Sequence, residues 1–121
     1  MKITIETIPH GEQRYPTCGD WVWEPNGDLT VKVSAMGDWR YEAAVGIHEA
    51  VEALLCKQDG VSQTAVDQFD IGYDGGDGEP GNDPEAPYHE QHCAATEVEK
   101  MLIEGLGLSW NEYDAAVEAL S

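Results

Sequence analysis

Hydrophobic and polar residues alternate with a period of two in the first third of the chain, which predicts β-strands. Between Lys2 and Ile8, isoleucine alternates with threonine and glutamate, as in a strand with one buried face. Two further runs, 20–24 and 29–35, flank the dipeptide Asn26-Gly27. Asn-Gly accommodates the positive φ angles of tight turns, so these two runs are expected to form a β-hairpin.

After residue 36 the pattern changes to a helical period, and three or four helices are expected. Their predicted ranges are 39–57, 63–69, 87–105 and 110–120. Suitable N-caps precede three of them: Asp38, Ser62 and Ser109. Ser109 also forms a capping box with Glu112. Pro87 suits the first turn of its helix, where the missing N–H costs no hydrogen bond.

The segment from about 71 to 87 follows neither period, because Gly, Asp and Pro succeed one another quickly. We expect an acidic loop with elevated mobility, and a loop this long is a candidate lid over a neighbouring site. The 121 residues fit one domain, with a β-rich part (1–36) and a helical part (37–121). The expected fold class is α+β: a small N-terminal antiparallel sheet, a strand plus a hairpin, packed against three or four helices.

Ionisable side chains interrupt the apolar faces of the two long helices. On the first helix, His48 lies within the apolar stripe and Glu52 at its edge, one turn later. On the second, His92 and Glu99 lie at the edge of the stripe, and His89 lies in a neighbouring row. That second stripe consists of Tyr88, Ala95, Val98, Leu102 and Leu106. If the two stripes face each other, His48, Glu52, His92 and Glu99 converge between the helices.

Such a convergence has two interpretations. Two imidazoles and one or two carboxylates are a usual ligand set for zinc, manganese or ferrous iron. The alternative is a buried polar network in which each histidine is satisfied by a carboxylate, because buried polar groups need partners.

The chain is strongly acidic, with 24 Asp and Glu against 6 Lys and Arg and a net charge of −18. Residues 41–121 hold 18 of the acidic side chains but only two of the basic ones. A direct nucleic-acid partner requires clustered Lys and Arg, and an anionic membrane surface repels an acidic protein, so both are excluded. A surface of this charge favours a basic protein as partner.

The cysteine pattern favours a reducing compartment. Cys18, Cys56 and Cys93 are few, odd in number and without a CxxC pair, unlike a disulfide scaffold. No secretion-signal pattern follows Lys2, and no stretch approaches the roughly 18 apolar residues of a membrane span. We therefore expect a cytoplasmic protein, in which Cys56 and Cys93 are small buried side chains.

The segment His48-Glu49-Ala50-Val51-Glu52 is an HExxE motif, similar to the HExxH helix of zincin metallopeptidases. The resemblance implies that His48 and Glu52 are metal ligands and that Glu49 is the catalytic general base. It also implies a third ligand from downstream, with His92 the first candidate and His89 the next. Glutamate in place of the second histidine makes the site more anionic. The leading hypothesis is a metal-binding protein and, in its stronger form, a minimal metallohydrolase.

Four segments, HEAVEALLC, VDQFD, PG-ND-P-E-APYHEQH and LGLSWNEY, resemble small uncharacterised proteins encoded by tailed phages and prophages. This resemblance implies a phage or prophage source, and hence the cytoplasm of a host cell, but no activity. Combined with the acidity of the chain, it gives an alternative hypothesis. In that alternative, the protein inhibits a basic host protein, either a defence protein or one that binds nucleic acid.

A second alternative concerns Glu49-x-x-Glu52 and Asp67-x-x-Asp70, which resemble the paired acidic motifs of the all-α nucleoside-triphosphate pyrophosphatases. The resemblance implies a Mg²⁺-dependent nucleotide pyrophosphohydrolase. Asp67 replaces the glutamate of that family, and no Lys or Arg lies near the motif to neutralise a triphosphate.

Overall fold

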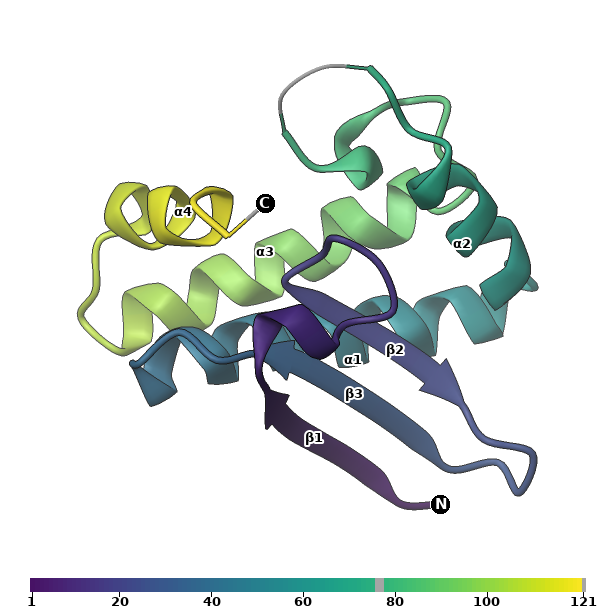
Figure 1. Cartoon of the computed structure of the whole chain (residues 1–121), viewed down its shortest axis with the longest axis horizontal. Helices are drawn as coiled ribbons and strands as arrows, with labels where there is room; N and C mark the ends of the chain where they lie inside the picture. Colours follow the sequence, from purple (N-terminus) through teal and green to yellow (C-terminus); the bar gives the residue numbers. More distant parts are fainter. Residues whose placement is uncertain (76–77, 121) are drawn as a thin grey trace.

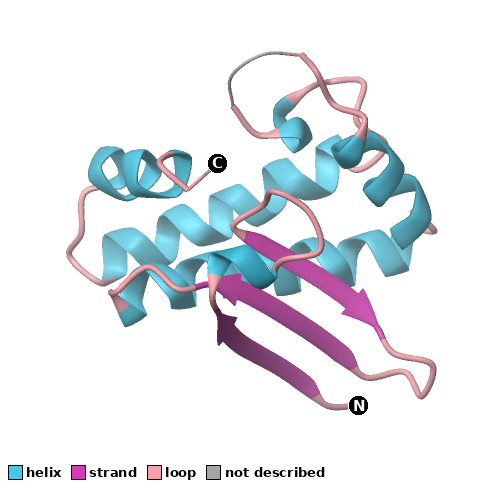
Figure 2. Cartoon of the chain, in the orientation of Figure 1, coloured by secondary structure: helices cyan, strands magenta, loops and turns pink. Residues whose placement is uncertain are grey.

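The computed structural model describes residues 1–75 and 78–120 and has an α+β fold, as predicted (Figures 1 and 2). A three-stranded sheet is formed by β1 (Ile3–Ile8), β2 (Gly19–Trp23) and β3 (Leu29–Ser34). The helices are α1 (Trp39–Asp59), α2 (Gln63–Ile71), α3 (His89–Gly105) and α4 (Trp110–Glu118). Two short 3₁₀ helices, η1 (His10–Glu12) and η2 (Pro80–Asn82), lie in the connections.

The sheet is mixed, which corrects the prediction of an antiparallel sheet (Figure 1). β2 and β3 form the predicted antiparallel hairpin, with Gly27 at φ 92° in its turn. β1, however, pairs parallel to β3, so the strand order is β1-β3-β2. On β1, Ile3 and Ile5 both stay 42% exposed, and Ile8 is only partly buried. β3 is central because its inward-facing side chains are fully buried: Leu29, Val31 and Val33.

The helices begin where the caps predict. Each of the three predicted N-caps accepts a hydrogen bond from a backbone N–H two or three residues later: Asp38, Ser62 and Ser109. Gly60 ends α1 in the left-handed conformation, with φ 74°. The start of α3 differs from the prediction. Pro87 precedes the helix because the next residue, Tyr88, has a non-helical backbone (φ −116°, ψ 20°) and is the N-cap.

α1 packs on the sheet with one face and along α3 with another, and α1 and α3 run in opposite directions (Figure 1). The hydrophobic core joins the sheet to the helices through, among others, Trp21, Val31, Ala44, Val45, Ala53, Cys56, Ile103 and Tyr113. On α3 the buried face differs from the predicted stripe, since Val98 is exposed. The buried residues of α3 are Gln91, His92, Ala95, Glu99 and Ile103.

Arg14 fixes α2 against the sheet. Its Nε lies 2.7 Å from Asp20 Oδ2 on β2, and its Nη1 lies 3.0 Å from Asp67 Oδ2 on α2. One guanidinium therefore joins β2 to α2. Within residues 1–75 and 78–120, no helix has the length and apolar character needed to cross a membrane.

Candidate metal centre

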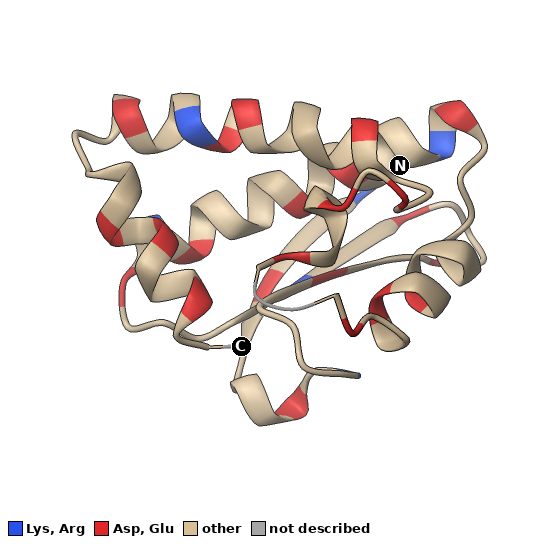
Figure 3. Ribbon diagram, turned by 90° about the horizontal axis from the view of Figure 1, so that it is seen from above, with Lys and Arg blue, Asp and Glu red and all other residues tan. Residues whose placement is uncertain are grey.

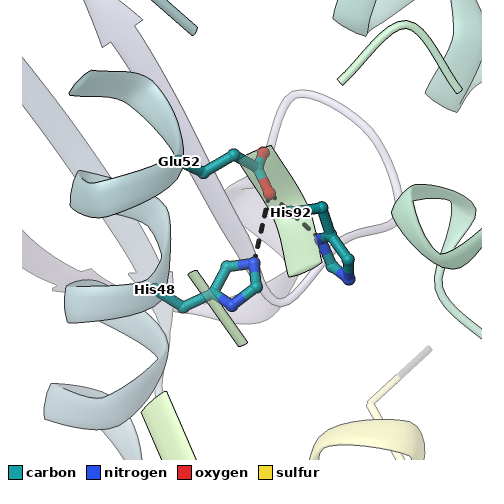
Figure 4. Close-up of side chains that lie close together, drawn as sticks. All are labelled: His48, Glu52 and His92. Atoms are coloured by element: carbon teal, nitrogen blue, oxygen red, sulfur yellow. Dashed lines mark hydrogen bonds and ion pairs between the residues drawn. The ribbon is translucent and has the colours of Figure 1, made fainter. Parts of the chain in front are cut away.

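Three polar side chains meet between α1 and α3 (Figure 4). His48 and Glu52 lie one turn apart on α1, and His92 comes from α3. Glu52 Oε2 lies 3.1 Å from His48 Nε2 and 3.0 Å from His92 Nδ1. All three residues are buried, at 4–5% exposure, and one ligand atom from each lies within 4.8 Å of the others. This buried cluster could hold a metal ion.

Two of the three distances between these ligand atoms are close to those around a small bound ion. Ligand atoms bound at 2.0–2.2 Å in a tetrahedral zinc site are about 3.3 Å apart. The two distances to Glu52 Oε2 are slightly shorter than that. Gly81 of η2 packs directly against the imidazole of His92. A Cβ atom on Gly81 would lie only 2.4 Å from His92 Cγ.

Each imidazole is oriented by an acceptor on the side away from Glu52. His48 Nδ1 lies 2.8 Å from Glu99 Oε1, and Glu99 also accepts a hydrogen bond from the Tyr113 hydroxyl. His92 Nε2 lies 3.1 Å from both Asn82 Oδ1 and Glu79 Oε2. Outer partners of this kind fix the ring and the tautomer of a histidine that binds metal. They leave His48 Nε2 and His92 Nδ1 directed at the centre of the cluster.

Glu52 is oriented in the same way. The indole Nε1 of Trp21, on β2, donates a hydrogen bond of 3.0 Å to Glu52 Oε1. One carboxylate oxygen is therefore held by the sheet, and the other, Oε2, is directed at the two imidazoles. If the cluster held a metal ion, Oε2 of Glu52 would be the oxygen available to bind it.

The charges within the cluster depend on one another. Burial opposes ionisation of Glu52, but the hydrogen bonds from His48 and His92 outweigh it and lower the pKa of Glu52 to about 2. Burial also opposes protonation of His92, yet Glu52 and Glu79 raise its pKa to about 9. The pKa of His48 is raised well above its ordinary value by Glu52 and Glu99, again against burial. Without a metal, the centre therefore holds protons at neutral pH.

A cavity of about 660 Å³ borders the cluster and reaches Glu49, which follows His48 on α1. Glu49 is partly buried, and no group in the described part of the chain donates a hydrogen bond to its carboxylate. Burial and the nearby charge of Glu52 raise its pKa well above the ordinary value. Gly19 on β2 makes room for this side chain, since a Cβ there would lie 2.7 Å from Glu49 Cγ.

The other two predicted ligands lie outside the three-residue cluster. Glu99 contacts the outer nitrogen of His48. His89 lies one turn before His92, and its Nδ1 is 2.9 Å from the carbonyl oxygen of Gly81. Cys93, predicted to be buried, is exposed, and its Sγ lies 3.6 Å from His89 Nε2, one turn earlier on α3. Cys56 is buried, as predicted.

The acidic loop contributes to the site through its second half. Glu79 and Asn82 both lie close to His92 Nε2. The pattern of hydrophobic and polar residues gives no signal for either of them, because this loop follows no helical or strand period. Residues 76–77 lie outside the described part of the chain, so the expected mobility of this loop and its role as a lid stay predictions. Trp21 and Tyr113 are further contributors that the sequence analysis missed. Their buried polar atoms, which need partners, are the signal that could have identified them.

The second acidic pair of the pyrophosphatase alternative, Asp67 and Asp70, forms hydrogen bonds with side chains outside the His48, Glu52 and His92 cluster. Asp67 is bound by Arg14, which lies 53 residues away in the sequence, and Asp70 accepts hydrogen bonds from Tyr15 and Tyr88. Among the described residues, the group that could hold a metal is His48, Glu52 and His92.

Figure 3 shows Asp and Glu over the helices and loops and few Lys and Arg. The basic protein partner stays a prediction from this charge.

Comparisons with protein-family models, curated proteins and solved structures found no match for this chain.

The metal-free protein is expected to lose stability as the pH rises through about 9. An unfolded histidine has a pKa near 6.5, so the folded protein binds more protons between these two values. The stabilisation from His92 is fully present below about pH 6.5 and disappears above 9, with a loss of about 3 kcal/mol. Urea unfolding in the presence of a chelator measures it. His92→Gln should remove the part of the slope that His92 contributes, while His48, whose pKa is also raised, keeps its own part. An equal slope in that variant would contradict this assignment.

Proposed function

We propose that the protein binds one zinc ion through His48, Glu52 and His92 and acts as a small metallohydrolase. The observation that carries the proposal is the buried convergence of these ligand atoms, with both imidazoles oriented from outside by acceptors. Burying two imidazoles and a carboxylate together is costly unless their charges are compensated. A divalent cation replaces the protons of the metal-free cluster and compensates the carboxylate.

The donor set favours zinc. Two imidazole nitrogens and one carboxylate oxygen are the protein ligands of several catalytic zinc sites, which keep a fourth position open. Manganese and ferrous iron also accept such ligands and are the alternatives. A zinc ion held here would lower the pKa of a coordinated water to about 7 and supply a nucleophile for hydrolysis.

Glu49 is the proposed general base. It follows His48 on α1, reaches the cavity beside the cluster, and has no hydrogen-bond donor within the described residues that competes for its carboxylate. It can therefore accept a proton from water and pass it to a leaving group. Glu99, Glu79 and Trp21 hold the ligands and take no part in proton transfer.

A phage or prophage origin, and therefore the cytoplasm of a host cell, remains part of the proposal because of the four segments described above. The alternative function, inhibition of a basic host protein, is supported by the net charge of −18. The two functions can be distinguished by the residues and conditions on which binding depends. Metal binding should depend on the histidines, whereas association through exposed acids should weaken with salt, since such charges are screened within about 8 Å at physiological ionic strength.

Protein purified without a histidine tag and without chelator is expected to contain about one zinc per chain. Elemental analysis measures the content, and a chelator should lower the melting temperature. Glu49→Gln should keep the zinc and lose hydrolysis of a panel of fluorogenic peptide and ester substrates, because the amide cannot accept the proton. Glu97→Gln, exposed on α3, is the control. Absence of stoichiometric metal, with a melting temperature unchanged by chelator, would contradict the zinc site.

A further inference from the structure

The geometry points to a binding site for a primary ammonium group in the cavity beside the metal centre, with Asp70 as the residue that receives it. This inference rests on the proposed function, since the ammonium would hold a substrate next to the zinc ion. The substrate class is then an amine, such as a peptide with a free amino group.

Asp70 is the aspartate in this region that forms no ion pair with Lys or Arg among the described residues. It lies on α2, is partly buried, and lines the cavity. Its two oxygens accept hydrogen bonds from neutral donors, the hydroxyls of Tyr15 and Tyr88. The neighbouring aspartates Asp20 and Asp67 are both paired with Arg14. No Lys or Arg in residues 1–75 and 78–120 forms such a pair with Asp70, so its negative charge is free to bind a cation from outside.

The surroundings of Asp70 suit an ammonium group. Tyr15, Tyr73 and Tyr88 line the same cavity, and aromatic rings attract a nearby cation. An ionised carboxylate has about four lone-pair directions, of which the two tyrosines occupy one on each oxygen. The planar fork of a guanidinium binds best when both oxygens are open, whereas a compact ammonium can use the remaining directions. The site therefore favours an ammonium over a guanidinium.

Tyr88 connects this site to the metal centre. It precedes His92 by one helical turn, and the centroids of the two rings are 6.2 Å apart. Its hydroxyl, at the far end of the ring, donates to Asp70. A molecule whose ammonium contacts Asp70 can therefore lie along the Tyr88 ring with its other end at the zinc ion.

The electrostatic field of the cavity also favours a cationic ligand. Its described lining contains eight carboxylates and two imidazoles but neither Lys nor Arg. Even with a zinc ion and Arg14 included, negative charges exceed positive ones. Such a field concentrates cations and repels phosphates and carboxylates. Nucleotides are thus disfavoured as substrates of this cavity.

Three probes of similar shape test the inference: benzylamine, benzyl alcohol and benzoate, titrated into the full chain at pH 7.5 by calorimetry. The ammonium form of benzylamine should bind at least about tenfold more tightly than benzyl alcohol, and benzoate should bind most weakly. Asp70→Asn should abolish the preference for the amine. Glu97→Gln, which removes an exposed carboxylate outside the cavity lining, should keep it. Equal binding of amine and alcohol, or an unchanged preference in Asp70→Asn, would overturn the inference.

The same titrations are repeated with zinc and after chelation, which separates this inference from the proposed function. An amine that coordinates zinc would bind independently of Asp70, so only an Asp70-dependent preference counts as support. If zinc does not bind but the preference persists in chelated protein, the zinc site fails and the ammonium site stands. If Asp70→Asn does not fold, NMR of the unaltered protein decides. Benzylamine should then shift resonances of Tyr15 and Tyr88, and unchanged resonances of both tyrosines would overturn the site.

Discussion

His92→Ala is expected to abolish tight zinc binding, lowering the affinity by about 10³-fold or more. Zinc sites in proteins are worth about 10–16 kcal/mol, so one of three protein ligands carries several kcal/mol. The metal-free fold should also lose about 3 kcal/mol, because the buried carboxylate of Glu52 loses one of its two imidazole partners. Competition with a chromophoric chelator measures the affinity, and urea unfolding measures the stability. His48→Ala should behave in the same way.

His89→Ala is the matched control for this loss. It removes an imidazole from the same helix, one turn earlier, which contacts the carbonyl of Gly81 and lies outside the cluster. Zinc affinity should change by less than about threefold, because no ligand or outer acceptor is removed. Equal affinities in His89→Ala and His92→Ala would mean that the structure misassigns the third ligand. Full zinc binding in His48→Ala and His92→Ala would exclude the centre altogether.

The parts of the fold that depend on neighbouring residues could be predicted from the sequence. The hairpin follows from Asn26-Gly27, and the helix starts follow from Asp38, Ser62 and Ser109, because a turn or a cap is decided within a few residues. The pairing of β1 with β3 could not be predicted in this way. It depends on which strand buries most apolar surface in the assembled sheet, and Leu29, Val31 and Val33 give β3 the central position.

The candidate site was predictable to a similar extent. His48 and Glu52 are four residues apart, so helical geometry alone places them on one face. The addition of His92 required the further assumption that two apolar faces pack together, and the structure brings the three residues into one cluster. Glu79 and Asn82 come from a loop without a period, and Trp21 comes from a strand. Their contacts exist only in the folded chain.

Gly81→Ala is expected to disrupt the metal centre without removing any ligand. The added Cβ would lie 2.4 Å from His92 Cγ, 2.5 Å from His92 Nδ1 and 2.9 Å from Tyr88 Cε2. Carbon atoms in van der Waals contact are about 3.5–4.0 Å apart, so either the His92 ring or η2 must move. Movement of the ring displaces Nδ1 from the cluster, and movement of η2 displaces Asn82, which contacts Nε2.

Zinc affinity in Gly81→Ala should therefore fall by about 10²-fold, as when the outer partners of a ligand are lost. Overpacking at this buried position should also lower the free energy of unfolding by about 1–3 kcal/mol. Gly105→Ala, at the end of α3, is the control, because its Cβ would meet no atom within 4 Å. Alanine is a better helix former than glycine, so that control should keep zinc affinity and match or exceed the stability of the unaltered protein. Unchanged zinc affinity in Gly81→Ala would contradict the proposed dependence of the metal centre on the packing of η2 against the His92 ring.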